Sequence, residues 1–144
     1  MHELINHPIV KAYIAHNHFG ELLGMDFQVG APGEIEYHMD IHEKHLATPR
    51  AAHGGAVSAF MDATMGVCAL TQVVRENKVV STIEMKISFV SPALIGKKLI
   101  GTAKTIKKGK RIVFVEGQIH NEAGTLIAMA SGTFNVYPAE KAGF

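Results

Sequence analysis

Residues 53–75 read HGGAVSAFMDATMGVCALTQVVR, a stretch that opens on two glycines and continues almost entirely with apolar and small side chains. Its longest apolar run, residues 63–74, is closed off by the charged residues Asp62 and Arg75. That run is shorter than the roughly 20 apolar residues that a membrane-spanning helix needs. The stretch therefore predicts one long helix, from about Gly54 to Arg75, buried in a folded core.

Shorter periodic segments lie on both sides of this predicted helix. Several strands with brief turns between them follow it, so neighbouring strands are expected to pair antiparallel. The sequence therefore predicts an α+β fold in which the long helix packs on one face of a curved antiparallel sheet. We expect a first helix over residues 8–18, a turn segment at Gly20 and Gly24, and strands over residues 25–29, 34–42, 79–91, 98–107, 111–120 and 125–137.

The first strand after the long helix has a regular period of two, which predicts one buried and one solvent-facing side. Its apolar side is formed by Ile83, Met85, Ile87 and Phe89, and its polar side by Glu84, Lys86 and Ser88.

The composition is that of an ordinary globular protein, with 144 residues, 47% hydrophobic and 19% charged. We expect a single domain over residues 1–144. A net charge of +1 offers no general attraction to nucleic acid or to an anionic membrane surface. Cys68 is the only cysteine, so no intrachain disulfide can form, and this favours a cytoplasmic location.

Asp62 is a charged residue in the middle of the apolar helix. Burying a charge is costly unless hydrogen bonds compensate it, and groups held in this way tend to lie at functional sites. Asp62 is therefore a candidate catalytic carboxylate. The alternative is that it bonds a neighbouring hydroxyl or a helix end in a purely structural role.

His53, Gly54 and Gly55 open the predicted helix. Two residues without side chains leave backbone N–H groups open to close approach, and the positive end of a helix favours negative charge. These features suit an oxyanion hole, which stabilises the charge that develops on a carbonyl oxygen during acyl transfer. The glycines could equally serve a tight turn or close packing.

Gly54 and Asp62 are eight residues apart, which is about 12 Å along a helix that rises 1.5 Å per residue. One short aspartate side chain cannot close that gap. If both groups act on the same carbonyl carbon, they must come from two subunits. The spacing therefore predicts a homodimer with its active sites at the interface, and we further expect two dimers to pair.

The stretch from His53 to Ala63 resembles the HGG-x6-[DE] signature of hotdog-fold acyl-CoA thioesterases, the PaaI-like family of phenylacetyl-CoA and 4-hydroxybenzoyl-CoA thioesterases. Residues 80–93 are similar to the strand that follows the helix in that family, and residues 124–134 to its last strand. The resemblance covers nearly the whole chain. It implies a hotdog fold, an acyl-CoA substrate and no cofactor.

By this resemblance Gly54 would supply the oxyanion-hole N–H, and Asp62 of the partner subunit would act as general base or nucleophile. Thr82 falls where the family often has a hydroxyl that positions the water or the carboxylate, although it could be an ordinary strand residue. The role expected for His53 is to fix the loop through hydrogen bonds. The family usually carries Asn or Gln where this chain has Ala47, and the adjacent Thr48 could partly compensate.

Two other groups of polar residues invite a ligand. The basic turn formed by Lys107, Lys108, Lys110 and Arg111 could bind the phosphates of CoA, or could be a solvated hairpin tip. Nine histidines suggest a metal, but a metal site needs ligands that converge from several elements. His38, Asp40 and His42 share one strand face, with His45 and His53 following, and solvated strand histidines rather than a metal site are expected there.

The sequence thus predicts hydrolysis of an acyl-CoA thioester to a carboxylic acid and free CoA. Two alternatives remain. A non-catalytic acyl or CoA-binding protein would agree with the missing amide at Ala47. A hotdog enoyl-CoA hydratase or dehydratase would share the fold, but its usual histidine-containing signatures are absent.

Overall fold

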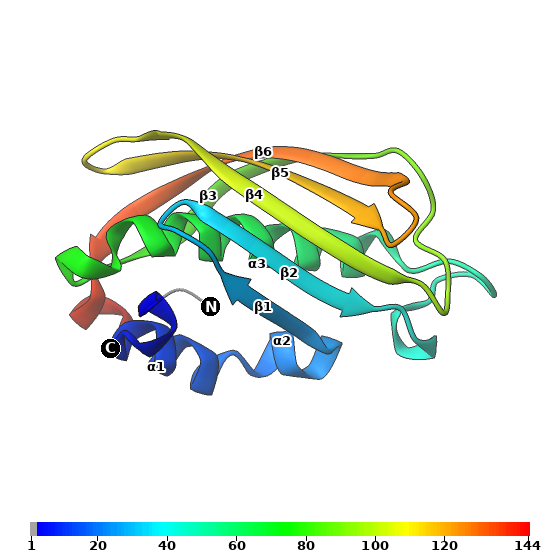
Figure 1. Ribbon diagram of the computed structural model, residues 1–144, viewed down its shortest axis with the longest axis horizontal. Helices are drawn as coiled ribbons and strands as arrows, with labels where there is room; N and C mark the ends of the chain where they lie inside the picture. Colours follow the sequence, from blue (N-terminus) through cyan, green and yellow to red (C-terminus); the bar gives the residue numbers. More distant parts are fainter. Residues whose placement is uncertain (1–2) are drawn as a thin grey trace.

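The computed structural model describes residues 3–144, so the first two residues of the expected domain lie outside the described part (Figure 1). The elements follow the order that the sequence predicts, with one additional helix. The helices are η1 Glu3–Asn6, α1 Pro8–His16, α2 His18–Leu23, η2 Glu43–His45, α3 Gly54–Val73, η3 Val74–Glu76 and η4 Ala139–Ala142, where η denotes a 3-10 turn. The strands are β1 Met25–Val29, β2 Glu34–Asp40, β3 Lys78–Phe89, β4 Lys98–Lys108, β5 Ile112–Asn121 and β6 Leu126–Pro138.

All six strands form one antiparallel sheet in the order β1-β2-β4-β5-β6-β3. Helix α3 runs across one face of this sheet, and α1 and α2 lie beside β1 (Figure 1). The predicted α+β class, with a long central helix on an antiparallel sheet, is confirmed. Strand β3 is at one edge of the sheet and β1 at the other.

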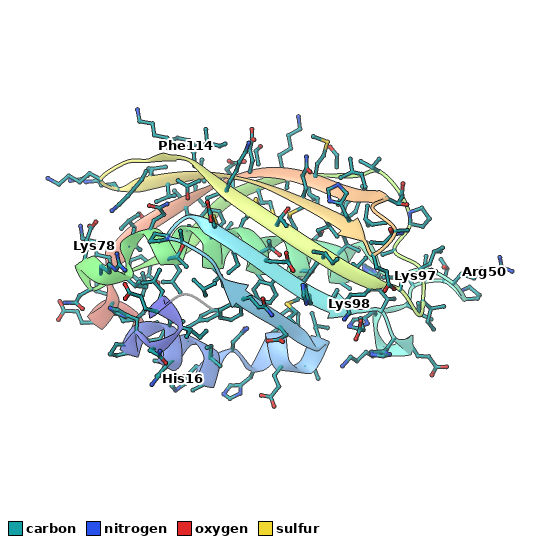
Figure 2. The ribbon with its side chains drawn as sticks, in the orientation of Figure 1. His16, Arg50, Lys78, Lys97, Lys98 and Phe114 are labelled. Carbon is teal, nitrogen blue, oxygen red and sulfur yellow. The ribbon has the colours of Figure 1, made fainter. Side chains whose placement is uncertain are left out.

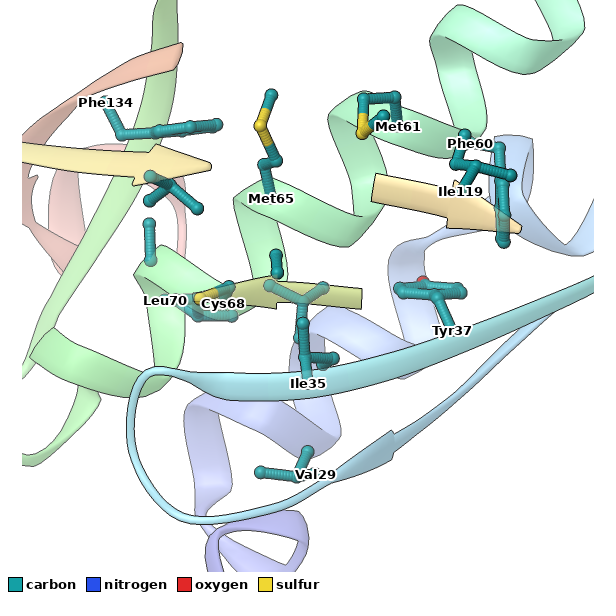
Figure 3. Close-up of a cluster of buried hydrophobic side chains, with 14 of the residues drawn as sticks. Val29, Ile35, Tyr37, Phe60, Met61, Met65, Cys68, Leu70, Ile119 and Phe134 are labelled. Atoms are coloured by element: carbon teal, nitrogen blue, oxygen red, sulfur yellow. The ribbon is translucent and has the colours of Figure 1, made fainter. Parts of the chain in front are cut away.

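The core lies between α3 and the sheet. Phe60, Met61 and Met65 of α3 are fully buried against Tyr37 of β2 and Phe134 of β6 (Figure 3). By length and composition α3 with η3 could cross a membrane, but 67% of its most apolar window is buried inside the protein. The helix is therefore the core element that the sequence predicts.

Glycines on the sheet let α3 approach closely. A Cβ at Gly101 of β4 would lie 2.5 Å from Thr64 Oγ1 and 3.2 Å from the Phe60 ring, and one at Gly117 of β5 would lie 2.8 Å from Met61 Sδ. These separations are too short for a real side chain. The position of α3 over the sheet therefore depends on the absence of side chains at these two points.

The segment with Gly20 and Gly24 was expected as a turn, and this expectation is wrong. It forms α2, because the Asn17 side chain caps the helix by accepting the Gly20 N–H (3.3 Å). Gly24 then ends the helix in the left-handed conformation (φ 76°), which glycine adopts without strain. Gly20 is thus an interior residue of a short helix, and Gly24 is its C-cap.

Strand β3 contains a β-bulge at Ile83, which the sequence did not predict. Thr82 pairs with Phe134 and Glu84 with Thr133, so Ile83 has no partner across the β3–β6 ladder, and its side chain is 54% exposed. Met85 pairs with Gly132, so the residues that face α3 have even numbers before the bulge and odd numbers after it. The predicted apolar side is therefore right for Met85, Ile87 and Phe89 and wrong for Ile83.

The close contact at Gly101 gives a stability prediction. Gly101→Ala should lower the free energy of unfolding by about 1 to 3 kcal/mol, because the new methyl group must displace Thr64 and Phe60. Thr102→Ala, at the neighbouring exposed position, is the matched control and should have a much smaller effect. Urea unfolding at equal protein concentration measures both, and a Gly101→Ala variant as stable as wild type would contradict this account of the packing.

Candidate active site

The N-terminus of α3 leaves one backbone donor open. His53 is the N-cap: its Nδ1 accepts the Gly55 N–H (2.7 Å), and its carbonyl accepts the Ala56 N–H (2.9 Å). Within residues 3–144 the Gly54 N–H has no acceptor. Gly54 is exposed, at the positive end of a 20-residue helix. The geometry thus separates Gly54, whose N–H is free, from Gly55, whose N–H is already bonded.

His45 holds the loop that leads to this end of the helix. Its side chain is only 2% exposed, and its Nδ1 accepts the His42 N–H (2.9 Å) while its Nε2 donates to the Leu23 carbonyl (2.8 Å). This network assigns a neutral ring with its proton on Nε2. The His45 carbonyl in turn accepts the His53 N–H (2.7 Å). The Leu23 contact of His45 comes from a segment distant in sequence, so the local pattern did not indicate this role.

Asp62 lies on the face of α3 that meets β3. It is half-buried, and its Oδ1 accepts a hydrogen bond from the Thr82 hydroxyl (2.7 Å). Its Oδ2 has no hydrogen-bond partner in the described chain. The bulge at Ile83 matters here, because it puts Thr82 on the same side of the sheet as Phe134 and α3. The bond to Thr82 fits both the structural and the catalytic interpretation of Asp62, whereas the open Oδ2 is what a catalytic carboxylate requires.

A cavity of about 190 Å³ opens beside Asp62. It has an apolar lining apart from Asp62, Ser81, Thr82 and two tyrosines. Burial raises the pKa of Tyr13, and the negative charge of Asp62 raises it further. The Tyr13 phenol therefore stays neutral at physiological pH. The cavity is lined by Tyr13, Asp62, Ala63, Gly66, Val67, Leu70, Val79, Val80, Ser81, Thr82, Phe134, Tyr137 and Phe144.

A larger hollow of about 570 Å³ lies on the opposite face of the sheet. Its walls include Lys86, Thr102, Glu116 and Gln118, and none of the residues predicted for the site. We therefore place the candidate active site at the smaller cavity, which contains the half-buried carboxylate of Asp62.

Gly54 and Asp62 belong to the same unbroken helix, α3. Their separation along it is therefore about 12 Å, as the helical rise requires. The structure brings Asp62 together with Thr82, and His53 together with Gly54 and Gly55, but it leaves these two groups apart within one chain.

The basic turn between β4 and β5 lies far from Gly54. Lys108 bonds Glu76, which follows the C-terminal end of α3, and this contact together with Lys78 lowers the pKa of Glu76. Gly54 is at the other end of α3, about 30 Å away by helix length. Figure 2 shows the two ends clearly, with Lys78 at one and Arg50 at the other. Within one chain the turn cannot contact a ligand group held at Gly54.

Ala47 and Thr48 lie in the exposed loop before α3. The Thr48 hydroxyl accepts the N–H groups of Arg50 (3.4 Å) and Ala51 (3.0 Å), so it stabilises its own turn. The suggestion that Thr48 compensates for the missing amide at Ala47 gains no support from this geometry.

The remaining candidate residues have structural contacts. His38 Nε2 bonds Glu36 (2.6 Å), and the described residues contain no group of three metal-ligating side chains. The Cys68 thiol is buried and donates to the Gly33 carbonyl (3.1 Å), and burial raises its pKa to about 11. A thiol with so high a pKa is a poor nucleophile at neutral pH.

Comparisons with known proteins identify the family and the fold of this chain. Residues 51–128, which include Gly54, Asp62 and Thr82, match the model of the thioesterase superfamily. The human protein acyl-coenzyme A thioesterase 13 is 32% identical over 127 residues, which is 87% of this chain and 89% of its own.

Two solved structures share the fold. The Escherichia coli PaaI protein from the phenylacetic acid degradation operon has a TM-score of 0.82 at 20% identity, covering 88% of this chain and 89% of its own. A Streptococcus mutans protein bound to acetyl-CoA has a TM-score of 0.69 at 18% identity, covering 79% and 89%. The hotdog fold is therefore confirmed, and with the family match and the human relative it follows that the chain belongs to the thioesterase superfamily.

Proposed function

We propose that the protein is an acyl-CoA thioesterase that acts as a homodimer, with Gly54 of one subunit and Asp62 of the partner subunit at each active site. The observation that carries the proposal is the pairing of two open groups: a helix N-terminal N–H without an acceptor, and a carboxylate held by Thr82 with one oxygen free. The human relative is named for acyl-CoA thioester hydrolysis, and the Streptococcus mutans structure contains acetyl-CoA.

The chemistry follows from these two groups. The Gly54 N–H, with the helix dipole behind it, would polarise the thioester carbonyl and stabilise the oxyanion that forms on attack. Asp62 would either take a proton from the attacking water or attack the carbonyl carbon itself. Collapse of the tetrahedral intermediate breaks the C–S bond, and the CoA thiolate leaves and takes up a proton; in the base route this is the proton that Asp62 took from water, and the acyl group leaves as the carboxylic acid. In the nucleophile route the acyl group stays on Asp62 as an anhydride, which a water molecule then hydrolyses to the carboxylic acid and the free Asp62 carboxylate. In either route Thr82 holds Oδ1, which leaves Oδ2 to face the attacking water as base or the carbonyl carbon as nucleophile.

The free edge of β3 supports the dimer. Strand β3 is 12 residues long, and its outer edge has no partner strand in the described chain. Phe89 and Val90 at its end are more than half exposed, as is Ile83 at the bulge. A long edge with exposed apolar side chains favours pairing with another chain. The other edge strand, β1, has five residues and is covered by α1 and α2 (Figure 1).

A twofold dimer would also place the basic turn of the partner subunit on the same side as Gly54. If Asp62 of the partner subunit lies beside Gly54, the two α3 helices run in opposite directions. The partner's basic turn then lies about 20 Å beyond Gly54, because Glu76 follows Asp62 by fourteen residues. Lys107, Lys110 and Arg111, which have no ion-pair partner among residues 3–144, are proposed to contact the phosphates of CoA from there.

A second candidate function is acyl-CoA binding without turnover. It is favoured by Ala47, which offers no amide to hold water or the carbonyl, and by the engagement of Thr48 in its own turn. The two functions differ in one observable, the release of free thiol from a bound acyl-CoA.

Removal of the carboxylate tests the proposed chemistry. Asp62→Asn should lower kcat at least 100-fold, because the amide keeps the shape and the Thr82 contact but cannot act as base or nucleophile. Thiol release from a panel of acyl-CoAs measures the rate, with Asp40→Asn, an exposed aspartate, as control. Full activity of Asp62→Asn would reject the assignment, and tight binding by wild type without thiol release would favour the second function.

Removal of the Gly54 N–H tests the oxyanion hole. Proline is well tolerated at the first position of a helix, and His53 (φ −60°, ψ 138°) already has the conformation that precedes proline. Gly54→Pro should therefore keep the fold and lower kcat about 100-fold or more. Gly54→Ala keeps the N–H and is the matched control. Equal rates for the two variants would mean that the N–H has no part in catalysis.

The division of the site between subunits can be tested by mixing these two variants. Gly54→Pro and Asp62→Asn subunits, denatured together and refolded, should regain about a quarter of wild-type activity, because about half of the dimers are mixed and one of their two sites is intact. Each variant refolded alone is the control. If both groups acted within one chain, mixing would restore nothing.

A further inference from the structure

We infer that the cavity beside Asp62 is the acyl-binding site, that it admits compact acyl groups, and that Phe144 closes its far end. The inference rests on the proposed function, since it names the substrate class of that site. It adds a size limit and the residue that sets it.

The cavity has the right surface for an acyl group. Its apolar walls include Val67, Leu70, Phe134 and Phe144. Two of its polar groups, Asp62 and Thr82, are hydrogen-bonded to each other. An acyl-CoA has one apolar end and one highly charged end, and only the acyl end gains free energy by burial in such a space. A thioester carbonyl placed at Asp62 would therefore direct its acyl chain into the cavity.

The strand register gives the cavity a direction. Its wall on α3 runs from Asp62 to Leu70, about 12 Å by the helical rise. Across from it β3 runs the opposite way, so that Thr82 lies at the Asp62 end and Val79, paired with Tyr137, at the other end. The cavity is thus a slot that extends from the carboxylate towards the C-terminal half of α3.

Phe144 lies at the end of the slot away from the carboxylate. Its N–H donates to the Ala139 carbonyl (3.2 Å), and the Ala139 N–H donates to the Asn77 carbonyl (3.0 Å), next to the start of β3. Gly143 has a φ of 88°, so the backbone turns back at this point. The Phe144 side chain lines the cavity and is still 43% exposed, so it separates the far end of the slot from solvent.

The volume sets the size of the acyl group. A protein cavity of roughly 150 Å³ holds benzene, so about 190 Å³ has room for one ring with a short link, or for a chain of similar size such as hexanoyl. Dodecanoyl and hexadecanoyl chains are too large for this space. The wild-type protein should therefore have its highest kcat/KM with short or single-ring acyl groups.

Phe144→Ala tests the role of the closing residue. The ratio of kcat/KM for dodecanoyl-CoA to that for hexanoyl-CoA should rise about tenfold or more, since opening an apolar pocket changes discrimination by such factors. Phe114→Ala is the matched control, because Phe114 has the same exposure (44%) but lies on the other face of the sheet (Figure 2). It should leave the ratio at its wild-type value. Phe144→Trp should shift preference the other way, from hexanoyl towards acetyl.

Binding gives a second readout that does not depend on turnover. Calorimetry of the acyl-CoA series on Asp62→Asn protein, with and without Phe144→Ala, should give the same shift in chain-length preference. If wild type releases no thiol but Phe144→Ala still shifts binding towards dodecanoyl-CoA, the acyl site stands and the proposed hydrolysis fails. If Phe144→Ala and Phe114→Ala have the same profile, or wild type prefers hexadecanoyl-CoA, the inference is overturned.

Discussion

The fixed rise of one helix is the constraint on which the candidate site depends. Gly54 and Asp62 both belong to α3, and no change of side-chain rotamer can bring them to one carbonyl carbon across about 12 Å. A helix cannot be shortened locally without breaking its hydrogen bonds. The open N–H and the carboxylate therefore meet only if a second α3 lies alongside in the opposite direction. In the proposed mechanism, activity therefore requires dimerisation.

The proposed site depends on where α3 lies and on which groups surround it. Three separate features determine this. Gly101 and Gly117 let the helix sit close on the sheet. His45, bonded on both ring nitrogens, holds the loop that delivers His53 to the helix start. The bulge at Ile83 turns Thr82 towards the helix, where it holds Asp62. Each contact joins segments that are far apart in sequence, so the packing of the core determines where the site residues lie.

The features that the sequence predicted correctly are local ones. The bounds of β1 are those predicted from the sequence, and α3 begins at the predicted Gly54. The features it missed depend on tertiary contacts. Apolar and polar residues alternate from Thr82 to Phe89, so the pattern at Ile83 itself does not indicate a bulge, although the alternation is broken just before it at residues 79–82. His45 is one of nine histidines in the chain and is distinguished only by its burial against Leu23. Thr82 could be placed near Asp62 by family resemblance, but its side of the sheet follows from the bulge.

The residues proposed to act on the thioester and several of those that line the acyl slot come from different parts of the chain. This suggests how such a protein can change its acyl substrate. Gly54, Asp62 and Thr82 lie within residues 51–128, the part that matches the thioesterase superfamily. Tyr13, Phe134 and Phe144, which line the proposed acyl slot, lie outside it. The groups proposed to act on the thioester are held by α3 and the bulge, whereas Phe144, in the segment after β6, is proposed to close the far end of the slot. A change of side chain at the far end alters the space for the acyl group and leaves the carboxylate and the open N–H where they are.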